Sequence, residues 1–191
     1  QKADLAGPNR TNSTASSANG YGYVGLGSDN GNLLKDWYQY DPSNNTWQSK
    51  ASLPGNPRFG AGAFSIQNMI YAGGGLDSLG NPKTDFYMYD PVMDTWTQKS
   101  SLLTGVACMA VFNIGQKGYF VAGLVNGSVS SVRVTAEYDV TNDTWTMKAD
   151  YPPGNTFSAI GFATQGYGYV GTGFTGSLTD VMYRYDPIGD T

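Results

Sequence analysis

The residue types that most often carry out catalysis are scarce in this chain. It contains no histidine, which removes the commonest general base and a common transition-metal ligand together. Cys108 is its single cysteine, so an internal disulfide is excluded. The apolar residues around Cys108 favour a small buried core residue over a nucleophile. We therefore expect no enzymatic activity, no metal centre and no cofactor.

Three arginines could in principle hold a carboxylate ligand through paired hydrogen bonds. They are Arg10, Arg58 and Arg133, and each lies in a different part of the chain. Ion pairs with Asp36 or Asp85 explain such arginines more simply than a shared anion site does. We expect them to stabilise the fold.

Two segments, 29–32 and 77–81, superficially resemble calcium-binding loops. They lack the spaced acidic positions and the closing glutamate of an EF-hand. Aspartate, asparagine and glycine are also the residues that tight turns prefer. We expect turns in these segments and no bound ion.

The overall charge excludes two classes of partner. The net charge is −4, the isoelectric point is near 4.5, and the 11 lysines and arginines are scattered along the chain. Nucleic-acid binding relies on clustered basic residues, and binding to a membrane surface relies on a basic face. No apolar run approaches the roughly 18 residues of a membrane-spanning helix. We predict no nucleic-acid partner and no membrane insertion.

The elements that position these residues follow an internal repeat. Its clearest copy runs from Tyr89 and Asp90 to Trp96, an aromatic strand that enters a tight turn and leaves it through a tryptophan. The other copies are Tyr40, Asp41 and Trp47, then Tyr138, Asp139 and Trp145, then Tyr185 and Asp186. The four tyrosines are 49, 49 and 47 residues apart. A fixed period near 50 indicates a repeat architecture.

Each repeat contains two further short segments ahead of the tyrosine. One is a strand that ends in glycines such as Gly73 and Gly74, and the other is an inner strand of small residues such as 59–64. We expect four strands in each unit: small-residue, glycine-ending, aromatic and tryptophan-bearing. The first inner strand, 11–17, is polar, so it should pack poorly or line a wet channel.

These motifs resemble the kelch repeat, in which a double glycine, a Tyr-Asp-Pro turn and a spaced tryptophan mark each four-stranded blade of a β-propeller. The resemblance covers essentially the whole chain, although the third copy has Val140 where the others have proline. It implies one all-β domain, 1–191, with repeats near 10–53, 58–102, 107–151 and 156–191. It also makes the repeated glycines, tyrosines, aspartates and tryptophans structural.

The chain ends allow two closures. Residues 1–5 match the ends of other outer strands, so we expect them to form the outer strand of the last blade. The blades then close into a four-bladed ring, or form an arc completed by another copy or by further blades. The resemblance favours the arc, because kelch propellers usually have six or seven blades.

The resemblance also suggests enzymes. Some kelch-like proteins are copper radical oxidases, but their copper site cannot be built without histidine. Some bacterial kelch proteins isomerise sialic acids. An isomerase or lyase acting on an acidic sugar, with Arg58 and Arg133 as ligands, is therefore the least supported alternative.

Recognition is expected on one face of the propeller. In an up-and-down blade, the loop between the second and third strands emerges on the same face as the connection into the next blade. These loops vary most between copies, and variable loops on a rigid scaffold commonly carry recognition. The predicted binding residues are Asn30, Asn32, Leu33, Leu34, Trp37, Arg58, Leu76, Asp77, Asn81, Asn126, Arg133 and Phe174.

We therefore predict a non-enzymatic scaffold that binds a protein or a glycan through this face. The alternative is a structural unit whose incomplete ends pair between chains and form a homo-oligomer. The segment Gln1-Lys2-Ala3-Asp4 is also similar to strands of kelch proteins from environmental bacteria. That similarity implies an extracellular or cell-surface location.

Overall fold

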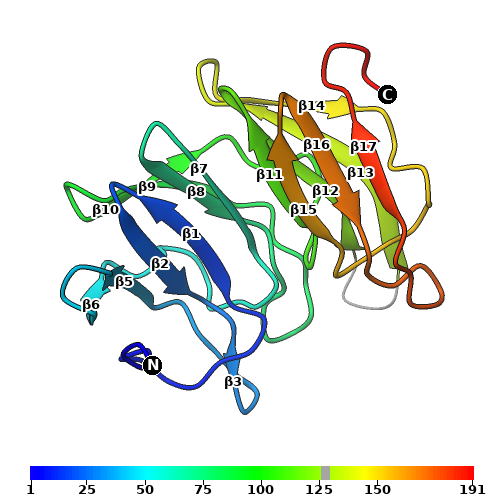
Figure 1. The fold of residues 1–191 in the computed structure, drawn as a ribbon. Helices are drawn as coiled ribbons and strands as arrows, with labels where there is room; N and C mark the ends of the chain where they lie inside the picture. The colour runs from blue at the N-terminus through cyan, green and yellow to red at the C-terminus, as the bar shows by residue number, and fades with distance from the viewer. Residues whose placement is uncertain (126–129) are drawn as a thin grey trace.

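The computed structural model describes residues 1–125 and 130–191. All regular structure in these residues is β-strand, and four antiparallel sheets follow one another around a common axis (Figure 1). The predicted all-β, four-blade propeller is confirmed. No helix among the described residues is long and apolar enough to cross a membrane.

Each blade is a simple antiparallel meander. Blade 1 contains β1 (Thr14–Ala18), β2 (Tyr21–Gly25), β5 (Trp37–Asp41) and β6 (Thr46–Lys50). Blade 2 contains β7 (Gly62–Ile66), β8 (Met69–Gly73), β9 (Phe86–Asp90) and β10 (Thr95–Lys99). Blade 3 contains β11 (Ala110–Ile114), β12 (Lys117–Val125), β13 (Ser130–Asp139) and β14 (Thr144–Lys148). Blade 4 contains β15 (Ile160–Thr164), β16 (Tyr167–Gly171) and β17 (Met182–Tyr185). A small two-stranded hairpin, β3 (Ser28–Asp29) and β4 (Asn32–Leu33), extends from blade 1.

The inner strands begin about three residues later than the sequence suggested. The expected segment 59–64 is interrupted at Gly60, where φ is +66°, and the third copy is interrupted at Cys108, where φ is +54°. These residues turn the backbone so that it can bond to the neighbouring blade: the amide of Cys108 donates to the carbonyl of Gly60 at 2.8 Å. Cys108 therefore precedes β11 and does not lie within an inner strand, and burial raises the pKa of its thiol.

The aspartate of each Tyr-Asp turn caps the turn itself. The Asp90 carboxylate accepts hydrogen bonds from the amides of Val92 and Met93 at 2.8 and 3.1 Å. Asp139 accepts the same pair of bonds from Thr141 and Asn142. Because the carboxylate holds the turn, blade 3 forms it without proline.

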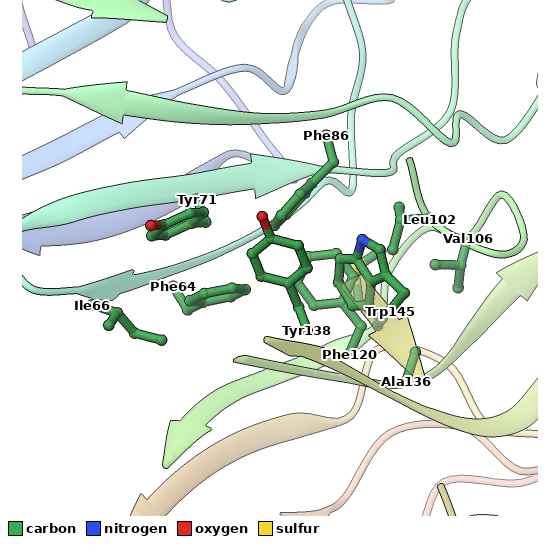
Figure 2. Close-up of a cluster of buried hydrophobic side chains, with 11 residues drawn as sticks. Phe64, Ile66, Tyr71, Phe86, Leu102, Val106, Phe120, Ala136, Tyr138 and Trp145 are labelled. Carbon is green, nitrogen blue, oxygen red and sulfur yellow. The ribbon is translucent and has the colours of Figure 1, made fainter. Parts of the chain in front are cut away.

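Aromatic side chains fill the junctions between blades. Figure 2 shows the largest cluster, which joins blades 2 and 3. The rings of Phe86 and Tyr138 meet edge to face with centroids 4.8 Å apart. Phe64 lies so close to Gly118 that a Cβ on the glycine would overlap its ring. Phe112 packs in the same way over Gly168 at the next junction.

The N-terminal segment lies against blade 1. Residues 1–5 form no strand, and the amide of Ala3 donates to Asn45 at 2.9 Å while the indole of Trp47 donates to the carbonyl of Ala3 at 3.0 Å. Figure 1 accordingly shows the N-terminus near β6 and distant from β17. The chain thus does not pair residues 1–5 with its own β17, and their role as an outer strand of the last blade stays a prediction.

Candidate binding surface

The β3–β4 hairpin forms one wall of a groove on the face that carries the variable loops. Its two-residue turn is Asn30-Gly31, with φ of +48° and +89°. Asparagine and glycine are favoured in such turns because both central residues need positive φ. The hairpin exposes Asn30 and Asn32 and leaves Leu33 half-buried.

The 77–81 loop forms the other wall, and Asp77 organises it. Its carboxylate accepts hydrogen bonds from the amides of Asn81 and Leu79, both at 2.9 Å, and from the Lys83 ammonium at 3.2 Å. Led by the bond from the Asn81 amide, these contacts lower the pKa of Asp77 to about 2. Asp77 therefore holds the loop together, as turn chemistry predicts, and Leu79 at the tip is 83% exposed.

Between the two walls lies a groove of about 410 Å³. It is lined by Thr11, Asn12, Ser28, Gly31, Leu33, Phe59, Asp77, Ser78 and Gly80. Hydroxyl and amide groups alternate there with the apolar side chains of Leu33 and Phe59. The one charged group in this lining is the Asp77 carboxylate, which already accepts hydrogen bonds from its own loop, so the groove suits a polar ligand with some apolar surface and no negative charge.

A second cavity on this face, in blade 4, is more apolar. It has a volume of about 610 Å³ and is lined by Phe157, Ser158, Thr172, Gly173, Phe174, Leu178 and Thr179. The rings of Phe157 and Phe174 lie 5.3 Å apart, and Leu178 is 86% exposed. The sequence prediction included Phe174 and missed Leu178. The repeated Ser-Leu pair, Ser78-Leu79 and Ser177-Leu178, could have identified it.

Several residues predicted to bind a ligand are buried in the structure. Trp37 and Arg58 are 0% exposed, so neither can contact a ligand at the surface. Leu76 is also buried, whereas Leu34 is half-buried and Asn81 is exposed. Asn126 lies outside the described residues. The loops emerge on the predicted face, but their anchoring residues point into the blades.

The three arginines are engaged by acidic residues. Arg58 bonds to both carboxylate oxygens of Asp85 at 2.6 Å, and Arg10 bonds to both oxygens of Asp36 at 2.7 and 2.9 Å. Burial raises the pKa of Asp85, but the hydrogen bonds and charge of Arg58 outweigh this, and the net pKa is lowered. These pairs confirm the predicted structural role of both arginines.

Arg133 is exposed and pairs separately, with its Nε 2.9 Å from a carboxylate oxygen of Asp150. The three guanidinium groups therefore face three different acids. They do not form one site for the carboxylate of an acidic sugar. No three acidic, cysteine or histidine side chains in the described ranges come together as metal ligands either.

The four inner strands line an open central cavity of about 560 Å³. Each strand contributes three residues to it, including Ser16 and Ser17 of β1, Asn113 of β11 and Phe162 of β15. The polar first strand thus lines a channel, as its composition suggested. The lining bears no charged group, so this cavity offers no acid or base for catalysis.

Comparison with known proteins supports the same architecture. Residues 57–103 match the Kelch motif family, which covers blade 2 and its connections. No curated protein matches the chain. The solved structure of YjhT superposes with a TM-score of 0.77 at 18% identity, over 90% of this chain and 61% of that protein.

The described blades therefore form a β-propeller, and residues 57–103 carry a Kelch motif. The chain spans less than two thirds of the length of YjhT. At 18% identity this likeness concerns the fold alone.

Proposed function

We propose that this protein is a non-enzymatic binding scaffold, and that it recognises a protein partner through the loop face formed by residues 28–33, 77–81 and 174–179. The groove between the first two loops is the observation that supports this most directly. Leu79 and Leu178, at 83% and 86% exposure, would supply apolar contacts at two points on the face. Variable loops on a rigid scaffold are common recognition sites.

A glycan is the alternative ligand of the same face. The hydroxyl and amide groups of the groove could bond to sugar hydroxyls, and Phe59 could pack against a sugar ring. Exposed leucines are better suited to a protein surface, which is why we favour a protein. An extracellular or cell-surface location would suit either ligand and is proposed on the sequence resemblance alone.

Paired substitutions test this assignment. We expect Leu79→Asp and Leu178→Asp together to weaken binding to a protein partner or an arrayed glycan at least tenfold. Val92→Asp and Met93→Asp, in the exposed β9–β10 turn of blade 2, provide a matched control and should leave binding intact. A ligand that the loop variant binds as tightly as the unmodified protein would argue against this face.

A second candidate function, self-assembly through the chain ends, is supported by the complementary faces of blades 4 and 1. Phe162 occupies the position of Phe64 and Phe112, but it is 47% exposed whereas they are 4% exposed. Gly22 occupies the position of Gly118 and Gly168, and a Cβ there would meet only Tyr40 at 3.7 Å. Phe162 of one copy could therefore pack over Gly22 of another.

Backbone groups at the two faces are complementary as well. At the other junctions the amide of Gly75 donates to the carbonyl of Val106 at 2.8 Å, and that of Gly123 to Thr156 at 2.7 Å. Within the described chain, the equivalent amide of Gly173 and the equivalent carbonyl of Arg10 have no hydrogen-bond partner. A junction between copies would join them.

Native mass measured by light scattering tests self-assembly. A mass above 20.4 kDa that returns to 20.4 kDa in Gly22→Phe would support packing of blade 4 on blade 1. A monomer at high concentration, or an oligomer insensitive to Gly22→Phe, would contradict it.

A further inference from the structure

Two hairpins of this protein turn through the same pair of residues, asparagine followed by glycine. Asn19 and Gly20 connect β1 to β2, and Asn30 and Gly31 connect β3 to β4. The two asparagines have φ of +52° and +48°, and the two glycines have φ of +80° and +89°. All four residues are exposed, so the two turns match in sequence, conformation and contact with water. A third Asn-Gly pair, 126–127, lies outside the described residues.

An asparagine followed by glycine can modify itself without an enzyme. The glycine backbone nitrogen loses its proton to hydroxide and attacks the side-chain Cγ of the asparagine. The bond from Cγ to Nδ2 breaks, and Nδ2 takes a proton from water and leaves as ammonia. Water then opens the five-membered imide at one of its two carbonyls, which gives aspartate or isoaspartate. Glycine favours the attack because no side chain crowds its nitrogen, and water is the only co-reactant.

The turn conformation itself holds this reaction back. A type I′ turn keeps ψ of its first central residue near about +30°, which directs the following nitrogen away from the asparagine side chain. The imide ring requires this nitrogen to lie beside Cγ, so the asparagine must leave the turn conformation before it reacts. The rate at each turn therefore follows the fraction of time for which that hairpin is locally open.

The turn at Asn19 is held closed by its blade. β1 and β2 pair over five residues each inside a four-stranded sheet. Ala18, directly before the turn, is buried, and so is Tyr23 on β2. The amide of Asn19 donates to the side-chain oxygen of Asn68 in blade 2 at 3.1 Å. Opening this turn would disturb the packing of two blades.

The turn at Asn30 has much less support. β3 and β4 form a two-stranded sheet of their own with two residue pairs, and Figure 1 shows the hairpin extending away from the blades. No side chain in residues 28–33 is buried. Isolated two-stranded hairpins are marginally stable in water. Ser28 and Thr11 exchange two backbone hydrogen bonds at 3.0 Å, which hold the base of the hairpin while its tip opens.

Either product of the reaction would change this hairpin. The Asn30 Nδ2 donates to the Asp29 carboxylate at 2.9 Å, and a carboxylate in its place would lose that bond and repel Asp29. Isoaspartate also carries the main chain through its side chain, which lengthens the two-residue turn and disturbs the register of β3 and β4. Gly31 and Leu33 line the groove of about 410 Å³, so its wall would change with the turn.

We propose that Asn30 is a self-modification site, and that its slow conversion to isoaspartate reshapes the groove as the protein ages. The modification requires only the hairpin and water, so it does not depend on any ligand of the loop face. Its effect on ligand binding rests on the function proposed above for that face.

Peptide mapping of the full chain tests the selectivity. Trypsin releases residues 11–35 as one peptide that contains both turns, and electron-transfer fragmentation locates isoaspartate within it. After incubation in mildly alkaline buffer, and relative to a digest at time zero, we expect Asn30 to convert about tenfold or more faster than Asn19 because its hairpin opens more often. Equal conversion of the two asparagines would overturn the proposal.

The same mapping in concentrated urea tests the physical cause. Unfolding removes the difference between the hairpins, so Asn19 should accelerate until the two sites convert at similar rates. A preference for Asn30 that persists unchanged in the unfolded chain would show that the hairpin is not its origin, and would also contradict the proposal.

A variant tests the structural consequence. Asn30→Gly removes the reactive side chain and keeps the turn, because Gly-Gly also suits a type I′ turn. Hydrogen exchange of the Leu34 amide, which donates to Gly27 at 2.9 Å, reports on the hairpin. Exchange should accelerate in the aged unmodified sequence and stay constant in aged Asn30→Gly. Equal exchange in fresh and fully converted protein would contradict the predicted loss of register. Neither readout uses a ligand, so failure of the loop-face assignment would be seen separately.

Discussion

Trp96 and Ala51 are joined across the junction of the first two blades, with the indole Nε1 donating to the Ala51 carbonyl at 2.8 Å. The amide of Ala51 donates to Asp94 at 2.9 Å, and the buried hydroxyl of Tyr89 donates to the same carboxylate oxygen at 2.7 Å. Ala51, in the segment that connects blade 1 to blade 2, is thus hydrogen-bonded to blade 2 through both its amide and its carbonyl. We call this pair of bonds the clamp, and it explains why tyrosine, aspartate and tryptophan recur together.

We expect Asp94→Ala to reduce the free energy of unfolding by about 2–4 kcal/mol, because two donors lose their acceptor and one of them is buried. Asp94→Asn should lose less than about 1 kcal/mol, since asparagine tolerates the positive φ of 53° and keeps an acceptor oxygen. Blade 1 already uses Asn45 in this role. Urea unfolding measures both, and similar losses in the two variants would contradict the clamp.

Glycines at equivalent positions should respond differently to a methyl group. A Cβ on Gly168 would overlap the ring of Phe112, so Gly168→Ala should cost about 1–3 kcal/mol. Gly22 lies in an identical Tyr-Gly-Tyr-Val-Gly strand, but a Cβ there would meet only Tyr40, at an ordinary contact distance of 3.7 Å, so Gly22→Ala should change stability by less than about 0.5 kcal/mol. Thermal unfolding compares them, and equal effects would refute the interblade packing.

We expect the protein to keep its stability when Arg58 and Asp85 are both replaced by valine, but not when one of them is replaced alone. Removing one partner of a buried ion pair typically costs about 3–5 kcal/mol, and we expect this of Arg58→Val. Blade 3 carries Val106 and Val134 at the equivalent positions, so Arg58→Val with Asp85→Val should recover most of the loss. Chemical denaturation of the single and double variants tests this. A double variant no more stable than Arg58→Val would show that the pair is not interchangeable with apolar packing.

Stability should be nearly constant at neutral pH and fall at both extremes. The folded pKa values of Asp77 and Asp85 lie below their unfolded values, so their contributions are complete above the unfolded pKa and are lost as the pH falls through the folded values. Burial raises the pKa of Tyr89 and Tyr138, aided by bonds to Asp94 and Asp143, so that contribution is lost as the pH rises above about 10.

The unfolding free energy between pH 2 and 11 measures this profile. Without histidine, we expect little change between about pH 5 and 9. Asp77→Asn should flatten the acid limb and leave the alkaline limb unchanged. A transition centred near pH 6.5 would contradict this account.

The fold could be predicted from the sequence because the same motif residues recur in every blade. Tyr89, Asp90 and Trp96 recur in register because every blade needs their hydrogen bonds. Asp90 caps its turn and Tyr89 bonds to Asp94 nearby in the chain, whereas Trp96 bonds to the segment that enters its blade. The inner-strand starts were missed because the interruption at Cys108 depends on a hydrogen bond to another blade, which no local pattern reveals.

The candidate binding surface was predictable only in outline, and binding through the loop face stays a prediction. Trp37 and Leu76 look like exposed loop residues in the sequence and are buried anchors in the structure. The cavity of about 300 Å³ beside Tyr185 is lined by residues more than 40 positions apart, such as Thr135 and Ala149 with Asp190, so no local pattern in the sequence could predict it.

We propose that partners contact the loop face of the propeller, and photo-crosslinking can detect such contact. The photoreactive residue p-benzoylphenylalanine would be placed at Leu79, at Leu178 or, as the control, at Val92. We predict that a purified partner crosslinks efficiently from Leu79 or Leu178 and at background level from Val92. Efficient crosslinking from Val92, with only background from both leucine positions, would contradict the assignment of the loop face.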